Sequence, residues 1–193
     1  MEDRDMKVLE FVSLVRVCTR EQVQQMFFKD VHQNVAMRRL KYLADADYIR
    51  RDTYNLDKNK RRNAYVYYMD RKPGKKIIKH DLIVTDVIVK FIEEGYEIIE
   101  FERSCKIGNI IPDALIKVKK NGRVKRIILE VQISPNDCLS KYHNFREVII
   151  ENTNWQVMPV LYVVNNQNLK KKLNDIKVVY DNLNLEKVSD FID

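Results

Sequence analysis

The dipeptide Asn121-Gly122 joins two apolar runs within the segment IPDALIKVKKNGRVKRIILEVQIS, residues 111–134. Asn-Gly between two strand-like runs is the strongest short-range signal for a β-hairpin, because both central residues of a type I′ turn need a positive φ. If this dipeptide forms the turn, Asp113 lies directly opposite Glu130. A loop of odd length would shift the register and separate the two acids.

This register sorts the hairpin residues onto two faces. One face is wholly apolar and is predicted to be the core side: Ala114, Ile116, Val118, Ile127, Leu129 and Val131. The other face is predicted to be the solvent side: Asp113, Leu115, Ile128, Glu130 and Gln132. Opposed side chains lie about 5 Å apart, where like charges destabilise a sheet. A divalent cation would offset the repulsion between the two acids; in the alternative interpretation they only mark strand ends near solvent.

Length and composition exclude several classes of protein. The 193 residues are 45% apolar and 33% charged, enough for a core and for two small domains. No apolar run approaches the ~20 residues of a membrane helix, and the charged opening MEDRDMK does not resemble a secretory signal. The three cysteines are widely spaced and lack a CxxC pair. We therefore expect a cytoplasmic protein without membrane contacts, disulfides or a zinc site.

Positive charge is concentrated in the first part of the chain. Residues 1–76 hold 18 Lys and Arg against 11 Asp and Glu, whereas residues 77–193 hold 17 of each. A basic module followed by a neutral one indicates that the first module meets a polyanion. Pro73-Gly74, flanked by lysines, is the predicted boundary.

The basic module is predicted to contain three helices and a hairpin. Apolar residues at helical spacing predict a first helix over 4–16, with Met6, Leu9, Val12 (or Phe11) and Val15 on its buried stripe. Thr19 and Gln22 form a capping box that opens a short helix to about residue 26. A third helix over 32–44 buries Ala36, Leu40 and Leu43, and the segment 48–70 reads as two strands joined by a basic loop. This order resembles a winged helix-turn-helix over residues 1–74.

Double-stranded DNA is the partner that this module would suit. A helix enters the major groove, where Gln, Asn and Arg read base edges, while other cations contact phosphates. The third helix carries such side chains off its buried stripe, namely Gln33, Asn34, Arg38 and Lys41. The wing tip would carry Lys58, Lys60, Arg61 and Arg62. Asp47 stands where such modules usually have glycine, and Asp tolerates a left-handed backbone. A protein-interaction role is the alternative.

The second module begins with a predicted helix over 78–94, ended by Gly95. Strands are predicted at 96–103, 110–118 and 124–133, a helix at 137–151 with Tyr142 and His143 on its surface, and a buried strand at 157–165. A helix at 167–173 and a last strand at 177–181 complete the module. The element order is α-β-β-β-α-β.

The segments IPDALI and ILEVQIS resemble the motif of the PD-(D/E)XK nuclease-like fold. The resemblance implies a restriction-endonuclease-like domain over 77–193, in an α+β or α/β chain, with Asp113 and Glu130 holding Mg²⁺ or Mn²⁺. Gln132 stands where the motif has its lysine, and Lys141 of the following helix would supply the missing cation. Asp113, Glu130, Gln132 and Lys141 are thus the catalytic candidates.

A winged helix ahead of such a domain is similar to the replication-relaxation proteins of plasmids, phages and other mobile elements. The ending of the second motif also resembles the nuclease-like domain of competence proteins. Two functions follow from these resemblances. The chain is either a metal-dependent DNA-processing enzyme, or a DNA-binding regulator whose inactive nuclease-like domain mediates homodimerisation or contacts replication or relaxosome proteins.

Overall fold

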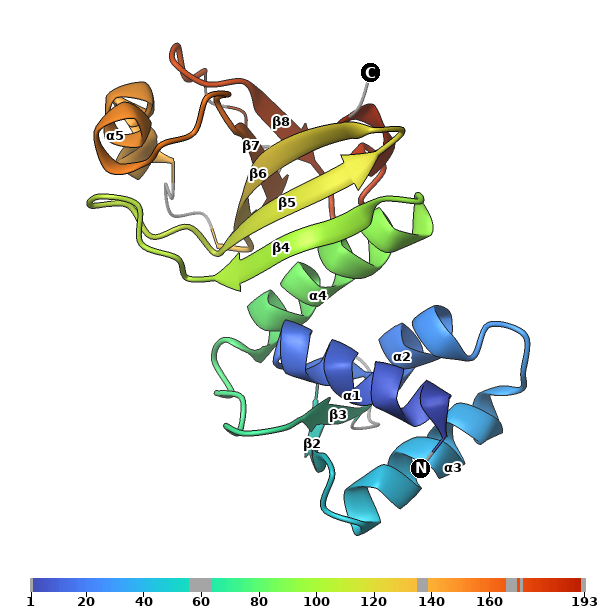
Figure 1. Ribbon diagram of the computed structural model, residues 1–193. Coiled ribbons are helices and arrows are strands. Elements are labelled where there is room, and N and C mark those ends of the chain that lie inside the picture. The colour runs from blue at the N-terminus through green and yellow to red at the C-terminus, as the bar shows by residue number, and fades with distance from the viewer. Residues whose placement is uncertain (1, 56–63, 135–138, 166–169, 171, 192–193) are drawn as a thin grey trace. The chain divides into compact units, whose positions relative to one another are not determined.

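The computed structural model describes residues 2–55, 64–134, 139–165, 170 and 172–191. Within these residues the protein is of mixed α+β class, with five α-helices, a three-stranded sheet and a five-stranded sheet (Figure 1). The chain forms two compact units, Met1–Val89 and Lys90–Asp193. This division falls inside a helix, and independent domains at 1–74 and 77–193 stay a prediction.

Three helices open the first unit: α1 (Asp3–Val15), α2 (Arg20–Phe27) and α3 (Gln33–Asp45). The predicted capping box of α2 is confirmed, because the Thr19 hydroxyl accepts from the backbone N–H of Gln22 at 3.2 Å and the Gln22 side chain accepts from that of Thr19 at 2.8 Å. Such a box satisfies two donors that have no partner inside the helix. On α1, Leu9, Val12 and Val15 are buried as predicted. The prediction for Met6 is wrong: its side chain is exposed, because Asp5 takes the inward position one residue earlier.

The small sheet is antiparallel, with the order β1-β3-β2. Its strands are β1 (Cys18–Thr19), β2 (Arg50–Tyr54) and β3 (Ala64–Tyr68). Asp47 adopts the predicted left-handed conformation, with φ of 58°. Its N–H and that of Tyr48 bond to the carbonyls of Ala44 and Leu43, which is the Schellman pattern that ends α3.

Helix α4 (Ile78–Glu93) was predicted as the start of the second module, but its first turns pack within the first unit. The side chain of Gln22 donates to the carbonyl of Leu82 at 3.1 Å, and the Thr85 hydroxyl donates to that of Val17 at 2.8 Å. Leu82 also joins a buried cluster with Val17 and Val66. These contacts tie α4 to α2, to the residue before β1, and to β3.

The second unit contains one five-stranded sheet of order β4-β5-β6-β7-β8. Its strands are β4 (Glu97–Arg103), β5 (Ala114–Lys120), β6 (Arg123–Gln132), β7 (Val160–Asn165) and β8 (Val178–Asp181). β4, β5 and β6 are antiparallel, whereas β7 and β8 continue the sheet in parallel. The predicted hairpin register is confirmed, with Ala114 opposite Leu129, and both Asn121 and Gly122 have positive φ, 51° and 77°.

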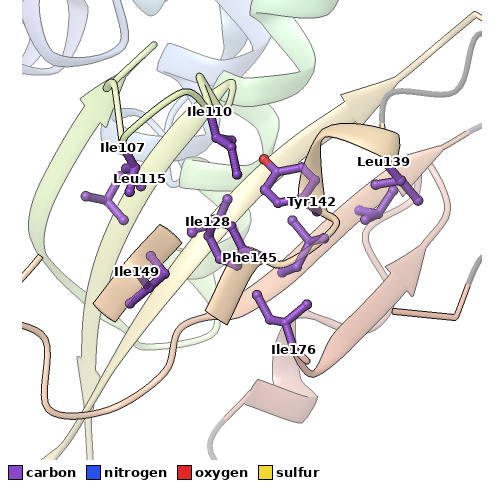
Figure 2. Packing of buried hydrophobic residues seen from close by; sticks show 11 residues of the cluster. Ile107, Ile110, Leu115, Ile128, Leu139, Tyr142, Phe145, Ile149 and Ile176 are labelled. Atoms are coloured by element: carbon purple, nitrogen blue, oxygen red, sulfur yellow. The ribbon is translucent and has the colours of Figure 1, made fainter. Parts of the chain in front are cut away.

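Both faces of the hairpin are buried, so the predicted solvent side is wrong. The face that carries Leu115 and Ile128 lies under the 3₁₀ turn η1 (Ser140–Tyr142) and helix α5 (Phe145–Asn152). Figure 2 shows Tyr142, Phe145 and Ile149 packed against these strand residues. The reason is the parallel pairing of β6 with β7, because the connection between parallel strands must cross over one face of the sheet.

Several predicted boundaries also change. β5 begins at Ala114 rather than at 110, and the single helix expected at 137–151 is a 3₁₀ turn and a separate helix, divided where Asn144 has φ of 59°. Tyr142 is buried, not a surface residue. The helix predicted at 167–173 falls mostly outside the described residues, and residues 172–173 are not helical.

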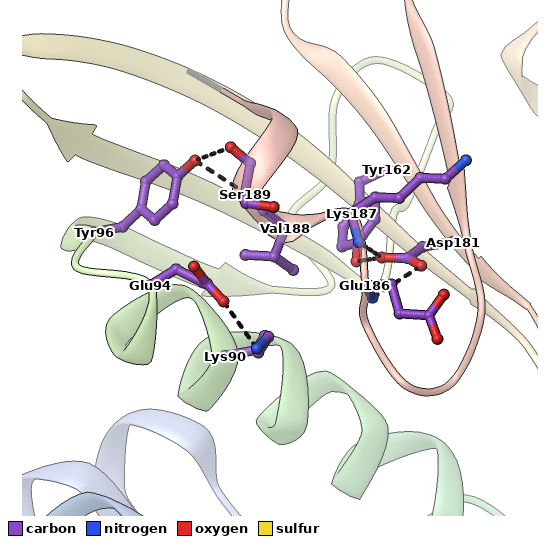
Figure 3. Close-up of polar contacts among 9 residues, drawn as sticks. All are labelled: Lys90, Glu94, Tyr96, Tyr162, Asp181, Glu186, Lys187, Val188 and Ser189. Atoms are coloured by element: carbon purple, nitrogen blue, oxygen red, sulfur yellow. Dashed lines mark hydrogen bonds and ion pairs between the residues drawn. The ribbon is translucent and has the colours of Figure 1, made fainter. Parts of the chain in front are cut away.

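The opposite face of the large sheet packs against aromatic rings. Phe91, Tyr162 and Phe191 form ring pairs with centroids 4.8 to 6.3 Å apart. Figure 3 shows the Tyr96 hydroxyl donating to the carbonyl of Val188, a hydrogen bond of 3.1 Å. Tyr96 directly precedes β4, so this bond ties the start of β4 to the 3₁₀ turn η2 (Val188–Phe191). The buried Tyr96 hydroxyl is thus paired, as buried polar groups usually are.

Candidate functional site

Helix α3 presents the predicted DNA-contact residues to solvent. Ala36, Leu40 and Leu43 hold the helix in the first unit, as predicted from their spacing. The four candidates on this helix are all exposed: Gln33, Asn34, Arg38 and Lys41. At 100° per residue, Asn34, Arg38 and Lys41 fall on one face, and Gln33 lies to one side of it.

The start of α3 is fixed by its own side chains. His32 is the N-cap residue, and its Nδ1 accepts from the backbone N–H of Asn34 at 3.3 Å. Arg38 Nε donates to the carbonyl of Asn34 at 3.4 Å, so the guanidinium lies along the helix surface. Lys41 Nζ lies 2.7 Å from Oδ2 of Asp45. Asp45 therefore neutralises part of the positive charge at the C-terminal end of this face.

The hairpin after α3 adds residues that sequence reasoning missed. The predicted wing-tip residues Lys58, Lys60, Arg61 and Arg62 lie outside the described residues. On the described strands, the guanidinium carbon of Arg51 lies 5.3 Å from the ring centroid of Tyr65, which is exposed. An alternating strand with arginine and tyrosine is the signal that would have suggested this pair.

In the second unit, Asp113 lies immediately before β5 and is fixed by the neighbouring strand. Its backbone N–H donates to the carbonyl of Leu129 at 3.1 Å. Its carboxylate Oδ2 accepts from the backbone N–H of Val131 at 2.7 Å. The backbone of Asp113 is therefore bonded to the residue before Glu130, and its carboxylate to the residue after it.

Glu130 is buried in β6, with 2% of its surface exposed, and its carboxylate is held from η1. Lys141 Nζ lies 2.7 Å from Oε1 of Glu130 and also donates to the carbonyl of Ile111 at 2.8 Å. The Tyr142 hydroxyl donates to the same Oε1. The structure thus brings together three of the four catalytic candidates, and adds Tyr142, which was expected on the surface.

The electrostatic environment raises the pKa of Glu130 to about 7. Burial is the main cause, because it disfavours the ionised carboxylate, and the negative charge of Asp113 adds to the shift. Lys141 and the Tyr142 hydroxyl act in the opposite direction. This carboxylate therefore exchanges its proton close to neutral pH.

Gln132 ends β6 and is buried, opposite the buried Asn165 of β7 in the parallel register. It lies on the same face as Glu130, two residues further along the strand. Gln132 and Asn165 thus place two buried amide groups at the ends of β6 and β7, and sequence reasoning did not identify Asn165.

The donor chemistry of this cluster fits Mg²⁺ or Mn²⁺. Mg²⁺ usually takes one or two carboxylates and completes its shell with water and substrate phosphates. Asp113 and Glu130 provide two carboxylates, and the described contacts of Glu130 both go to Oε1. Among the described residues, no group of three or more His, Cys, Asp and Glu side chains is arranged to hold a metal.

No protein-family model, curated protein or solved structure matches this chain.

Within the part of the chain that the structure describes, no helix has the length and apolar character to cross a membrane.

Proposed function

We propose that this protein binds double-stranded DNA through residues 1–74, acting as a winged helix-turn-helix with α3 in the major groove. The observation that carries the proposal is the solvent-facing side of α3, where Asn34, Arg38 and Lys41 lie together. These are side chains suited to base edges and phosphates. The excess of basic residues in the first 76 residues supports the same partner.

The arrangement of the first unit is compatible with this role. The helices α1, α2 and α3 precede the β2–β3 hairpin, and β1 pairs with β3. Helix α2 and its capping box precede the exposed helix, as in a helix-turn-helix. The four predicted phosphate contacts of the wing tip lie outside the described residues and stay a prediction.

The experiment is a fluorescence anisotropy titration of the full chain with labelled duplexes at several salt concentrations. Arg38→Ala should weaken binding by about 10-fold, and the slope of log K against log salt should become shallower by about 0.9 if Arg38 contacts a phosphate. Arg146→Ala on α5 removes an exposed arginine from the second unit and should leave binding unchanged. Equal effects of the two substitutions would contradict the assignment. A fragment that begins at residue 77 is unsuitable, because it would separate α4 from its partners in the first unit.

We further propose that the second unit is a nuclease-like domain, in a protein of a plasmid, phage or other mobile element that acts in DNA replication, relaxation or mobilisation. Asp113 and Glu130 would hold Mg²⁺ or Mn²⁺, which when bound would polarise a phosphodiester and lower the pKa of water. Lys141 would neutralise negative charge beside the carboxylates, and Gln132 would orient a water molecule by hydrogen bonding. The contact between Lys141 and Glu130 supports Lys141 as the substitute for the motif lysine.

The second candidate function is a non-enzymatic DNA-binding regulator or accessory factor. The observation that favours it is that Oε1 of Glu130 already has two partners in the protein, the ammonium of Lys141 and the hydroxyl of Tyr142. The second unit would then mediate homodimerisation or bind replication or relaxosome proteins. Metal-dependent cleavage separates the two candidates.

A further inference from the structure

A groove with a volume of about 660 Å³ opens in the second unit, beside β6 and the start of β7. Its walls come from residues 124–126, from the segment 154–160, and from residues 175–177. Pockets for small organic ligands usually enclose about 300–1,000 Å³. The groove is thus of a size for a small molecule rather than for a single ion.

Arg126 provides the polar anchor of the groove. Its guanidinium carbon lies 5.1 Å from the ring centroid of Trp155, so the aromatic ring fixes the position of the positive charge. Within the described residues, Arg126 Nε is buried but has no hydrogen-bond acceptor. A buried donor without an acceptor is unfavourable, and the planar guanidinium matches the oxygens of a phosphate. Nε itself is enclosed, but Arg126 as a whole is only half-buried and lines the groove, so its planar guanidinium is placed to meet an oxyanion.

The remaining lining combines positive charge with apolar surface. Lys125 and Lys177 line the groove together with a single carboxylate, that of Asp175. Lys125 Nζ donates to the carbonyl of Phe191, so Lys177 is the second cation for a ligand. The side chain of Val157 is 73% exposed.

Further apolar surface comes from Val124 and Met158, which line the groove beside Val157. A hydrated inorganic anion needs no such surface, whereas the sugar and base of a nucleotide would cover it.

We propose that this groove, called the Arg126–Trp155 groove, binds a nucleotide, with its phosphate on Arg126 and its base against Val124, Val157 and Met158. The source is either a free nucleotide or the end of a nucleic-acid strand. Arg126 lies four residues before Glu130 on β6, about 13 Å along the strand, so the groove is separate from the carboxylate cluster. The inference does not depend on duplex binding by α3.

Trp155 is the chain's single tryptophan and lines this groove, so its fluorescence responds to a ligand bound here. The full chain is titrated with thymidine 5′-monophosphate, thymidine, inorganic phosphate and a short single-stranded oligothymidylate. We expect a saturable change with the monophosphate and weaker binding of thymidine and of phosphate. Tighter binding of the oligonucleotide identifies a strand as the source, and equal binding identifies a free nucleotide. No saturable response to either nucleotide ligand would overturn the proposal.

Two substitutions test the anchor. Arg126→Gln should weaken binding of the monophosphate by about 10-fold or more, whereas Arg123→Gln, the same change outside the groove on the same strand, should leave it unchanged. Val157→Glu places a carboxylate at a largely exposed position and should weaken binding without affecting folding, which circular dichroism checks. Equal affinity of Val157→Glu and wild type, or equal effects of the two arginine substitutions, would reject the groove as the site.

Discussion

Asp5 of α1 is fully buried against Arg39 of α3, whose guanidinium donates to both oxygens of its carboxylate. Arg39 also lies 3.4 Å from a carboxylate oxygen of Glu2. A two-point contact between guanidinium and carboxylate is the stronger form of such pairs. The pair therefore fixes α1 against the helix that is proposed to enter DNA.

Removal of Arg39 should destabilise the protein much more than removal of its neighbour Arg38. Arg39→Ala leaves a buried carboxylate without its cation, at a cost of about 3 kcal/mol in the free energy of unfolding. Arg38→Ala changes an exposed side chain and should cost less than about 0.5 kcal/mol. Urea unfolding measures both, and similar losses would contradict the importance of the pair.

The same pair predicts a loss of stability in acid. The Arg39 guanidinium holds the pKa of Asp5 below its usual value. A lowered pKa in the folded state stabilises the protein above the unfolded pKa, near 3.9, and that stability is lost as pH falls through the folded pKa. The stability difference between wild type and Asp5→Asn should therefore shrink as pH is lowered from 6 towards 2. A difference that stays constant over this range would contradict the prediction.

Glu130 should give a pH dependence of the opposite sign. Its pKa is raised to about 7, so the folded state binds more protons than the unfolded state between pH 4.5 and 7. In EDTA, stability should fall as pH rises through this window, by an amount on the order of 3 kcal/mol. Glu130→Gln cannot titrate and should lose this slope, whereas Glu100→Gln, at an exposed ion pair with Lys117, should keep it. Thermal unfolding from pH 5 to 8 provides the measurement.

Metal binding and cleavage should both depend on Asp113. Calorimetry with Mg²⁺ or Mn²⁺ should show binding that is stronger at pH 8 than at pH 6, because the metal needs the ionised form of Glu130. Asp113→Asn should abolish metal binding and any cleavage of supercoiled or single-stranded DNA, with duplex binding unchanged. Gln132→Lys would restore the commoner motif and should increase cleavage. A wild type that neither binds these metals nor cleaves any DNA form would favour the regulator.

Two glycines with positive φ should respond differently to alanine. Gly122 has φ of 77° and open space around the position of a Cβ, so Gly122→Ala should cost only the backbone strain of about 1 kcal/mol. Gly108 has φ of 58°, and a Cβ there would lie 2.9 Å from Nδ2 of Asn152 and 3.0 Å from Cγ1 of Val148. Gly108→Ala adds this crowding to the strain and should cost more than about 2 kcal/mol. Equal losses in urea unfolding would show that the helix α5 side chains move aside freely.

Local signals predicted the parts of the structure that local geometry determines. Asn121-Gly122 fixed the register of the hairpin, because only a few residues separate the paired strands. Helical spacing gave the buried side of α3, and therefore its exposed face. These predictions needed no knowledge of distant contacts.

The environment of Glu130 could not be predicted in this way. The apolar run at 157–165 indicated a buried strand, but not that it would pair in parallel with β6. That pairing places η1 and α5 over the acidic face. Lys141 was predicted to lie near the acids because the site needs a cation, and the structure places it against Glu130. The single helix expected around Lys141 is instead interrupted at Asn144. The contact of Arg126 with Trp155 has no local periodicity that would reveal it.

The crossover between β6 and β7 also implies an order of events during folding. The β5–β6 hairpin can form early from neighbouring residues, while Glu130 is still hydrated. Leu139, Tyr142 and Phe145, which cover this face, come later in the chain, and the parallel strand β7 comes later still. The Glu130 carboxylate therefore loses its water in a late folding step. Because removing water from the ionised carboxylate costs more than removing it from the protonated one, folding should be slower above the pKa of this group than below it.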